Sequence, residues 1–221
     1  MEKTSGDKQQ TGEADLGRIE AVVFDIGNVL ISWDPCNLYR KMGFADSRTR
    51  QILEETALLE VNHRQLDAGA PYRESLEELA SQYPQHRDFI LAFDTRWTEM
   101  LDGAIAPSVA ALAKLKAEGV PVYGLSNFSL EKFELARRIF PFLESFDELV
   151  ISGAIKMVKP DREIFDYLIA RCRLDPARSL FIDDNQENIS AARELGFDAI
   201  LFVQGKTDLA HELAHRMVVR Q

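Results

Sequence analysis

The sequence predicts an α/β fold in which a parallel sheet carries helices on its faces. Three observations predict it: short apolar runs of strand character recur along the chain, helix-like segments separate them, and polar residues follow several of the runs. Strands separated by helices pair in parallel because each crossover returns the chain to the same edge of the sheet. At 221 residues, 46% of them hydrophobic, the chain can bury a full core and carry one insertion domain.

The first expected strand is Ala21–Phe24, an apolar run that ends on Asp25 and enters a glycine-containing turn. From position 35 to about 101 the pattern changes to helical repeats with no convincing strand between them. Helices are expected at 50–61, 72–82 and 86–100. This region therefore reads as a helical insertion.

Alternation of strands and helices resumes after Gly103. A helix is expected from Pro107 to Gly119, because proline favours the first turn and glycine the position just past the end. Further strands are expected at 120–125, 148–151, 179–182 and 199–203. Further helices are expected at 129–139 (with Ser129 as cap), at 162–172 and at 187–195, and the C-terminal helix is ambiguous.

Composition narrows the classes of partner and compartment. The formal charge of −10 argues against a nucleic-acid-binding protein. Cys36 and Cys172 lie far apart without metal-like spacing, so we expect reduced thiols in a cytoplasmic protein. No apolar run approaches the roughly 20 residues of a membrane span, and residues 1–17 read as a polar tail rather than a signal peptide. We expect no membrane partner and a monomer or homodimer.

Polar residues follow three of the expected strands and one later turn. They are Asp25, Ser126 with Asn127, Asp183 with Asp184, and Lys159 before a helix. Each alone is explained as a turn former, a helix cap or a loop lysine. Because parallel strands end at one edge of a sheet, together they supply a carboxylate nucleophile, a hydroxyl donor, a cation and paired oxygen ligands.

Four segments carry a resemblance to a known family. FDIGNVL, GLSN, MVKPD and FIDDNQEN are similar, in order and spacing, to the four motifs of the haloacid dehalogenase-like hydrolase superfamily. The resemblance covers roughly 18–203, and the first and last motifs are the more specific. It implies a Rossmann-like core at 18–34 and 102–221, with a helical cap inserted at 35–101. The DIGNV and DDNxxN forms most resemble glucose-1-phosphate phosphatase-like members.

The chemistry expected at these positions is phosphoryl transfer. Asp25 would attack phosphorus to give an aspartyl-phosphate, which divides one difficult hydrolysis into two displacements. Asp25, the carbonyl of Gly27 and Asp184 are the expected ligands of Mg²⁺. Asp183 is a second candidate that could exchange with Asp184. By the resemblance, Asn188 touches metal-bound water.

The phosphate is expected to be held by neutral donors and one cation. Ser126 would donate its hydroxyl to a phosphate oxygen, and Asn127 would add an amide donor. Lys159 would neutralise the nucleophile and the phosphoryl oxygens as a point charge. Backbone N–H groups at 26–28, including Asn28, would complete the cradle for the transition state.

Gly27 departs from the usual family pattern, in which the residue two beyond the nucleophile is an Asp that acts as general acid and base. Glycine can do neither, although its carbonyl can still bind a metal. Three outcomes stay open: a leaving group that needs no acid, such as a sugar anomeric oxygen, a substitute acid from elsewhere, or weak or absent activity. Asp34 and His63 are possible substitutes for the missing acid. Each also has an ordinary structural explanation, Asp34 as a turn former and His63 as a surface residue of the cap.

Substrate specificity is expected to reside in the cap. The segment 61–70, VNHRQLDAGA, resembles the cap turn that faces the active site in related members, so His63 and Arg64 are candidate substrate contacts. A solvated helix end is the alternative. Arg96 and Trp97 are further candidates, although an aromatic residue at helical spacing is more often part of a core.

The sequence thus predicts a Mg²⁺-dependent phosphatase acting on a small phosphorylated metabolite, with a sugar phosphate as the favoured substrate. One alternative is a 2-haloacid dehalogenase, which attacks carbon without metal. The paired Asp183 and Asp184 argue against it, because a metal-free site gains nothing from two extra anions beside a nucleophilic carboxylate. The other alternative is a non-catalytic module that binds a phosphorylated ligand or a partner.

Overall fold

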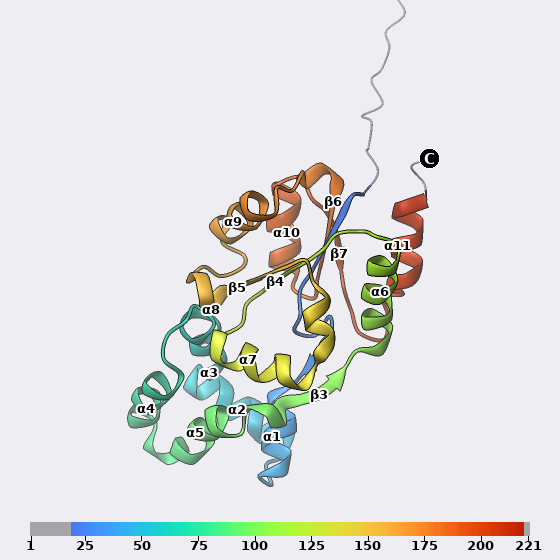
Figure 1. Ribbon diagram of the computed structural model, residues 1–221. Helices are drawn as coiled ribbons and strands as arrows, with labels where there is room; N and C mark the ends of the chain where they lie inside the picture. The colour runs from blue at the N-terminus through green and yellow to red at the C-terminus, as the bar shows by residue number, and fades with distance from the viewer. Residues whose placement is uncertain (1–18, 219–221) are drawn as a thin grey trace, which may run out of the picture.

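A computed structural model describes residues 19–218, so the expected tail at 1–17 lies outside the described residues. The core is a five-stranded parallel sheet in the order β5-β4-β1-β6-β7 (Figure 1). Its strands are β1 (Ala21–Phe24), β4 (Val122–Ser126), β5 (Glu148–Ile151), β6 (Ser179–Asp183) and β7 (Asp198–Leu201). The predicted α/β class with a parallel sheet is confirmed.

Helices cover both faces of the sheet, because alternate strand residues point to opposite sides. In β1, Val22 and Phe24 pack into one cluster and Val23 into the other. The first face carries α6 (Ala106–Ala117), α7 (Leu130–Ile139) and α11 (Leu209–Val218), and the second carries α9 (Arg162–Cys172) and α10 (Gln186–Glu194). Figure 1 shows α6 and α11 together on one side of the sheet and α9 and α10 on the other.

Residues 35–100, here called the helical insertion, are helical throughout most of their length and gather beyond one end of the sheet (Figure 1). Its helices are α1 (Pro35–Lys41), α2 (Asp46–Thr56), α3 (Leu58–Val61), α4 (Tyr72–Gln82) and α5 (Arg87–Thr95). Its tighter or wider turns are the π-helical η1 (Asn62–Leu66) and the 3₁₀ segments η2 (Pro84–His86) and η3 (Trp97–Met100).

Two expected helices of this region differ from the structure. The helix expected at 50–61 begins earlier, at Asp46, and is broken at Ala57, whose φ of 52° is left-handed. The helix expected at 86–100 ends at Thr95 and continues only as 3₁₀ turns. Both breaks occur where no Gly or Pro stands in the sequence, so composition gives no sign of them.

A short antiparallel ribbon that the sequence analysis does not predict joins the core to the helical insertion. It pairs β2 (Ile31–Trp33) with β3 (Leu101–Ala104). The Asp-Gly pair at 102–103 has the composition of a turn, and three or four residues are too few to show strand periodicity. The chain therefore enters and leaves the insertion through neighbouring strands.

Other boundaries differ by one or two residues. Ser129 caps α7 as expected, since its hydroxyl accepts from the backbone N–H of Lys132. The strand expected at 199–203 is β7, and the ambiguous C-terminal helix is α11. Among residues 19–218, no helix has both the length and the apolar composition needed to cross a bilayer.

The sheet order fixes where a site can form. Chain connections leave β1 in one direction toward β4 and β5, and the later strands β6 and β7 lie on its other side. In open parallel sheets the crevice at such a reversal, beyond the carboxyl ends of the strands, is where ligands bind. Here that crevice lies past β1, β4 and β6.

Candidate active site

Three neighbouring strands bring polar side chains to one crevice. Asp25 directly follows β1, Ser126 ends β4 and Asp183 ends β6, and all three are buried. The flanking strand residues Phe24 and Ile182 are fully buried, so packing fixes the position of each strand end. The sheet thus assembles residues that are up to 158 positions apart in the sequence (25 to 183).

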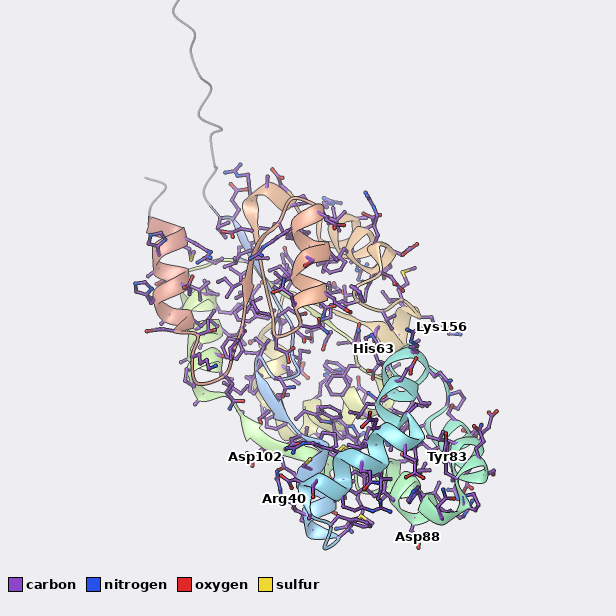
Figure 2. All side chains as sticks on the ribbon, turned by 180° about the vertical axis from the view of Figure 1, so that it is seen from behind. Arg40, His63, Tyr83, Asp88, Asp102 and Lys156 are labelled. Carbon is purple, nitrogen blue, oxygen red and sulfur yellow. The ribbon has the colours of Figure 1, made fainter. Side chains whose placement is uncertain are left out.

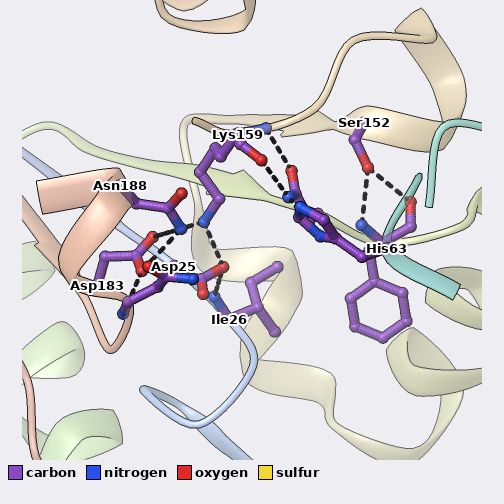
Figure 3. A network of polar contacts seen from close by, with 10 residues as sticks. Asp25, Ile26, His63, Ser152, Lys159, Asp183 and Asn188 are labelled. Carbon is purple, nitrogen blue, oxygen red and sulfur yellow. Dashed lines mark hydrogen bonds and ion pairs between the residues drawn. The ribbon is translucent and has the colours of Figure 1, made fainter. Parts of the chain in front are cut away.

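Lys159 is the cation of this crevice. It comes from the loop before α9 and is only 1% exposed. Its Nζ lies 2.9 Å from Asp25 Oδ1 and 2.6 Å from Asp183 Oδ2 (Figure 3). Burial lowers the pKa of Lys159, but Asp183 and Asp25 more than offset this, so the net shift is upward. The side chain is a fixed ammonium between two carboxylates.

Asn127 holds the Lys159 loop against the end of β4. Its Oδ1 accepts from the Lys159 N–H at 2.7 Å, and its Nδ2 donates to the Lys159 carbonyl at 2.8 Å. Figure 3 shows this reciprocal pair beside His63, whose Nδ1 lies 3.4 Å from Asn127 Nδ2. The Asn127 amide, expected to contact substrate, is thus occupied by the backbone of Lys159 in the structure.

Asp183 is fully buried and saturated with donors. Oδ1 accepts from the Asn185 N–H at 2.8 Å, and Asn188 Nδ2 lies 3.0 and 3.1 Å from the two oxygens. With Lys159 on Oδ2, both oxygens of Asp183 are engaged (Figure 3). Asp183 therefore orients Lys159 and Asn188.

Asp184, in contrast, is exposed at the crevice. Partial desolvation of its carboxyl in the crevice and then the neighbouring Asp183 raise the pKa of Asp184, and Lys159 opposes the shift. One oxygen each of Asp25, Asp183 and Asp184 falls within a 4.8 Å cluster. Three carboxylates share the single ammonium of Lys159, so the cluster has an excess of negative charge.

These donors fit a hard divalent cation. Carboxylate oxygens are the ligands that Mg²⁺ prefers, and it usually keeps several waters as well. Asn188 Oδ1 is buried without a hydrogen-bond partner among the described residues, as expected of an acceptor reserved for a bound water. Asp25 and Asp184, with Asp183 behind them, are the side chains that could hold the ion.

Asp25 is positioned by its own loop. Its Oδ1 accepts from the Ile26 N–H at 2.7 Å. Burial raises the pKa of Asp25, and the neighbouring Asp183 and Asp184 raise it further. Lys159 and a hydrogen bond from Ser126 lower it. The carboxylate is thus held in one orientation among charged neighbours.

The residues after Asp25 shape the mouth of the crevice. A Cβ at Gly27 would have no heavy atom within 4 Å, and its φ is not left-handed. Asn28 has a φ of 52°, and its Oδ1 accepts from the Trp33 N–H at 3.0 Å. Asn28 thereby ties this loop to β2.

The candidates from the insertion separate in space. His63 is half-buried next to Asn127, and burial lowers its pKa. Arg64 is 74% exposed and pairs with Glu60 at 3.2 Å. Figure 2 shows His63 at the end of the insertion nearest the core, with Arg40 and Asp88 at the far end. The structure brings His63 to the crevice and leaves Arg64 in solvent.

Asp34 and Arg96 have structural partners. Asp34 caps α1, accepting from the Cys36 N–H at 2.8 Å, and pairs with Arg40 at the surface. Arg96 binds Glu99 through two hydrogen bonds of 2.7 and 2.8 Å. Trp97 is buried, 5.6 Å from Phe128 between ring centroids.

One carboxyl group of the crevice was missed by sequence reasoning. Asp67 is buried, lies in the cap-turn segment 61–70, and lines a cavity together with Gly27. Burial raises its pKa well above the usual value, Asp25 adds to the shift, and a Ser129 N–H opposes it. In the sequence Asp67 precedes Ala-Gly and reads as an ordinary turn residue.

A family model described as haloacid dehalogenase-like hydrolase matches residues 19–196. Sesquiterpene phosphatase astK from Aspergillus oryzae is 26% identical, over 80% of this chain and 86% of that protein. D-ribitol-5-phosphate phosphatase from Bacteroides thetaiotaomicron is 27% identical, over 81% and 90%. Drimenol cyclase drtB from Aspergillus calidoustus is 28% identical over 83% of this chain, which spans only 34% of that protein.

Among solved structures, HAD family enzyme bt-2542 from Bacteroides thetaiotaomicron, in complex with magnesium and inorganic phosphate, has a TM-score of 0.69 and 26% identity. The match covers 88% of this chain and 98% of that one. The family model matches residues 19–196, which is most of the chain and includes every strand of the sheet except β7. The chain belongs to the haloacid dehalogenase-like hydrolase family.

Proposed function

We propose that this hydrolase is a Mg²⁺-dependent phosphatase that acts on a small phosphomonoester through an aspartyl-phosphate on Asp25. The observation that carries the proposal is the cluster of Asp25, Asp183 and Asp184 around the buried Lys159 ammonium. Phosphatases among the relatives, and a structural neighbour that holds magnesium and phosphate, support it.

In this proposal Asp25, Asp184 and the carbonyl of Gly27 would hold Mg²⁺, and Asn188 Oδ1 would be available to accept from a water beside the ion. The ion, when bound, neutralises phosphoryl charge and so permits attack by an anion. Asp183 has no oxygen left unpaired, because Lys159, Asn185 and Asn188 occupy both. Asp184 is for that reason the more direct ligand.

The protein residues carry the two displacements. Asp25 Oδ attacks phosphorus, the bond from phosphorus to the ester oxygen breaks, and that oxygen leaves as an alcohol after taking a proton. Water then attacks phosphorus, releasing inorganic phosphate and restoring the Asp25 carboxylate. Lys159 and the Ser126 hydroxyl stabilise the charge on the phosphoryl oxygens.

The proton for the leaving oxygen needs a donor other than Gly27. Asp67 is the carboxyl group that shares a cavity with Gly27, and its raised pKa favours the protonated form. A protonated carboxyl can donate, as a general acid must. We assign this role to Asp67; His63, with a lowered pKa, is less suited to hold a proton. Asp34 lies at the surface cap of α1.

The division into parts is also a proposal. Residues 18–34 and 102–221 would form the catalytic core, and 35–101 the helical cap that covers the crevice. Supporting this, His63 of the insertion lies 3.4 Å from Asn127 of the core, and the Asp67 carbonyl accepts from Ser152 of the core. The cap would exclude water while the phosphoryl group is transferred.

The test measures phosphate and halide release in parallel. The panel is 4-nitrophenyl, benzyl and sugar phosphates with Mg²⁺ or with EDTA, and 2-chloropropionate for halide. The proposal expects phosphate release that EDTA abolishes and no halide release. Halide release that persists in EDTA would identify a dehalogenase. No release from any substrate, together with tight binding of phosphate, would identify a binding module.

A further inference from the structure

A mostly apolar cavity of about 120 Å³ lies between the helical insertion and the core, and it adjoins the proposed phosphate site. Gly27 and Asn127 line it on the core side, so it begins next to the nucleophile and the Lys159 loop. Its remaining lining residues are Ile31, Trp33, Asn62, Asp67, Tyr72, Trp97, Leu101, Phe128 and Lys132. A group attached to a phosphate bound at Asp25 would therefore enter this cavity.

The polar side chains of the lining are bonded to one another. Tyr72 Oη donates to Asn62 Oδ1 at 2.9 Å, and Asn62 Nδ2 donates to Asp67 at 3.1 Å. The Lys132 ammonium lies 2.5 Å from Asp94 Oδ1 and over the ring of Tyr72. Because these side chains are already bonded to protein partners, few of their donors and acceptors are left for the hydroxyl groups of a sugar.

The charges of the lining are also cancelled. Lys132, 4% exposed by its side chain, pairs with Asp94 and Glu131. The raised pKa of Asp67 favours its neutral form. Arg64, which could have met a polar substrate, lies in solvent. What faces the cavity is mainly aromatic and aliphatic surface.

We infer that the cavity takes the hydrocarbon part of the substrate, a compact apolar group esterified to phosphate. The inference rests on the proposed phosphatase function and names its substrate class. Size sets an upper limit of about one ring, since a dry cavity of about 150 Å³ holds a benzene molecule and this one, at about 120 Å³, is smaller. The fitting group is a single ring or a short branched chain, in contrast to the sugar phosphate predicted from the sequence.

The chain offers a binding signal that does not depend on turnover. Its two tryptophans, Trp33 and Trp97, both line the cavity. Benzylphosphonate, which cannot be hydrolysed at its C–P bond, should change their fluorescence saturably in the presence of Mg²⁺. Methylphosphonate, which lacks the ring, should bind at least about tenfold more weakly, as expected for loss of a group from an apolar pocket.

A matched pair of variants tests whether the cavity lining causes the difference in binding between the two phosphonates. Leu101→Asn places an amide in the cavity lining and should weaken benzylphosphonate binding at least about tenfold while leaving methylphosphonate unchanged. Leu59→Asn makes the same change on the insertion at a side chain that is 39% exposed, and should alter neither. If Leu101→Asn lowers the melting temperature strongly, Leu101→Ala makes the same comparison without a buried amide.

Kinetics separate this inference from the proposed function. We expect kcat/KM for benzyl phosphate to exceed that for D-ribitol 5-phosphate at least about tenfold. The inference about the apolar cavity is overturned if D-ribitol 5-phosphate is the better substrate, or if the two phosphonates bind equally without a fluorescence change. Either result still leaves the protein a phosphatase. Absence of phosphate release from both esters with Mg²⁺ overturns the proposed function, and this inference with it.

Discussion

At the residue scale, Gly27 and Asp67 are complementary. Gly27 has no side chain that could donate a proton, and a buried carboxyl group from the insertion lines the same cavity. The raised pKa of Asp67 follows first from burial and then from the nearby Asp25 charge. In the proposed mechanism, the leaving oxygen would take its proton from the insertion instead of from the loop that bears Asp25.

Asp67→Asn should reduce activity according to the leaving group. With benzyl phosphate, whose alcohol needs a proton, kcat should fall about 10²-fold, in the range of general acid catalysis. With 4-nitrophenyl phosphate, which leaves readily as an anion, kcat should change less than about threefold, as expected where general acid catalysis is not needed. Steady-state phosphate release measures both. Equal losses on the two esters would show that Asp67 serves only to dock the insertion.

Gly27→Asp should rescue Asp67→Asn. A Cβ at Gly27 meets no heavy atom within 4 Å, so the new carboxyl group can reach into the cavity. In the double variant, kcat for benzyl phosphate should recover at least about tenfold, a fraction of the effect of a general acid. Gly27→Ala on the same background is the control and should restore nothing. Lack of recovery with Asp, in a folded protein, would contradict proton donation into this cavity.

At the element scale, small residues and one serine bring segment 61–70 of the insertion against the core, in addition to the contacts that His63 and Trp97 make with it. Ser152 Oγ donates to the Asp67 carbonyl at 2.5 Å and accepts from the Phe128 N–H at 2.8 Å. Gly69 passes so close to the core that a Cβ there would lie 2.7 Å from the Gly153 carbonyl oxygen. The cap turn and α8 (Ser152–Ile155) are therefore in direct backbone contact.

Gly69→Ala should loosen this contact. Both Gly69 (φ 90°) and Gly43 (φ 87°) are left-handed, but a Cβ at Gly43 meets nothing within 4 Å. Each substitution carries a strain of about 1 kcal/mol, and Gly69→Ala adds about 1–3 kcal/mol for the clash. Thermal or urea unfolding compares the two. Equal destabilisation would mean that the insertion is not packed this tightly against α8.

The sequence predicts the strands that read as buried apolar runs and misses the half-exposed β2–β3 ribbon. The four later strands and their helices are recognisable because each buries a regular face. The β2–β3 ribbon is not, since three or four residues show no period and Asp102-Gly103 resembles a turn. The break at Ala57 is missed because no Gly or Pro marks it in the sequence.

The residues of the candidate site also divide into those that the sequence predicts and those that it misses. Asp25, Ser126 and Asp183 lie where the sheet edge requires them, so strand reasoning alone brings them together. Asp67 reaches the crevice only because the insertion folds back over the core, and no pattern within 61–70 singles it out. Likewise, the two-sided hold of Asn127 on Lys159 is a contact between loops 32 residues apart.

At the scale of the whole molecule, metal binding should couple to stability. An ion that binds only the folded state stabilises it by about 2.7 kcal/mol at a concentration of 100 times Kd. Mg²⁺ should therefore raise the melting temperature, and Asp184→Asn should abolish the increase. Asp88→Asn, an exposed residue at the far end of the insertion (Figure 2), should retain it. An equal rise in all three proteins would place the ion elsewhere.

The central claim is that Asp25 is the nucleophile of a phosphatase, and one measurement tests it directly. Inorganic phosphate released from benzyl phosphate with Mg²⁺ is compared between the wild-type protein and Asp25→Asn, which keeps the shape of the side chain and removes the charged oxygen. We expect steady release by the wild-type protein and a loss of at least about 10³-fold in the variant, since an amide lacks the charged oxygen that would form the covalent intermediate. Release by Asp25→Asn within tenfold of wild type would contradict it.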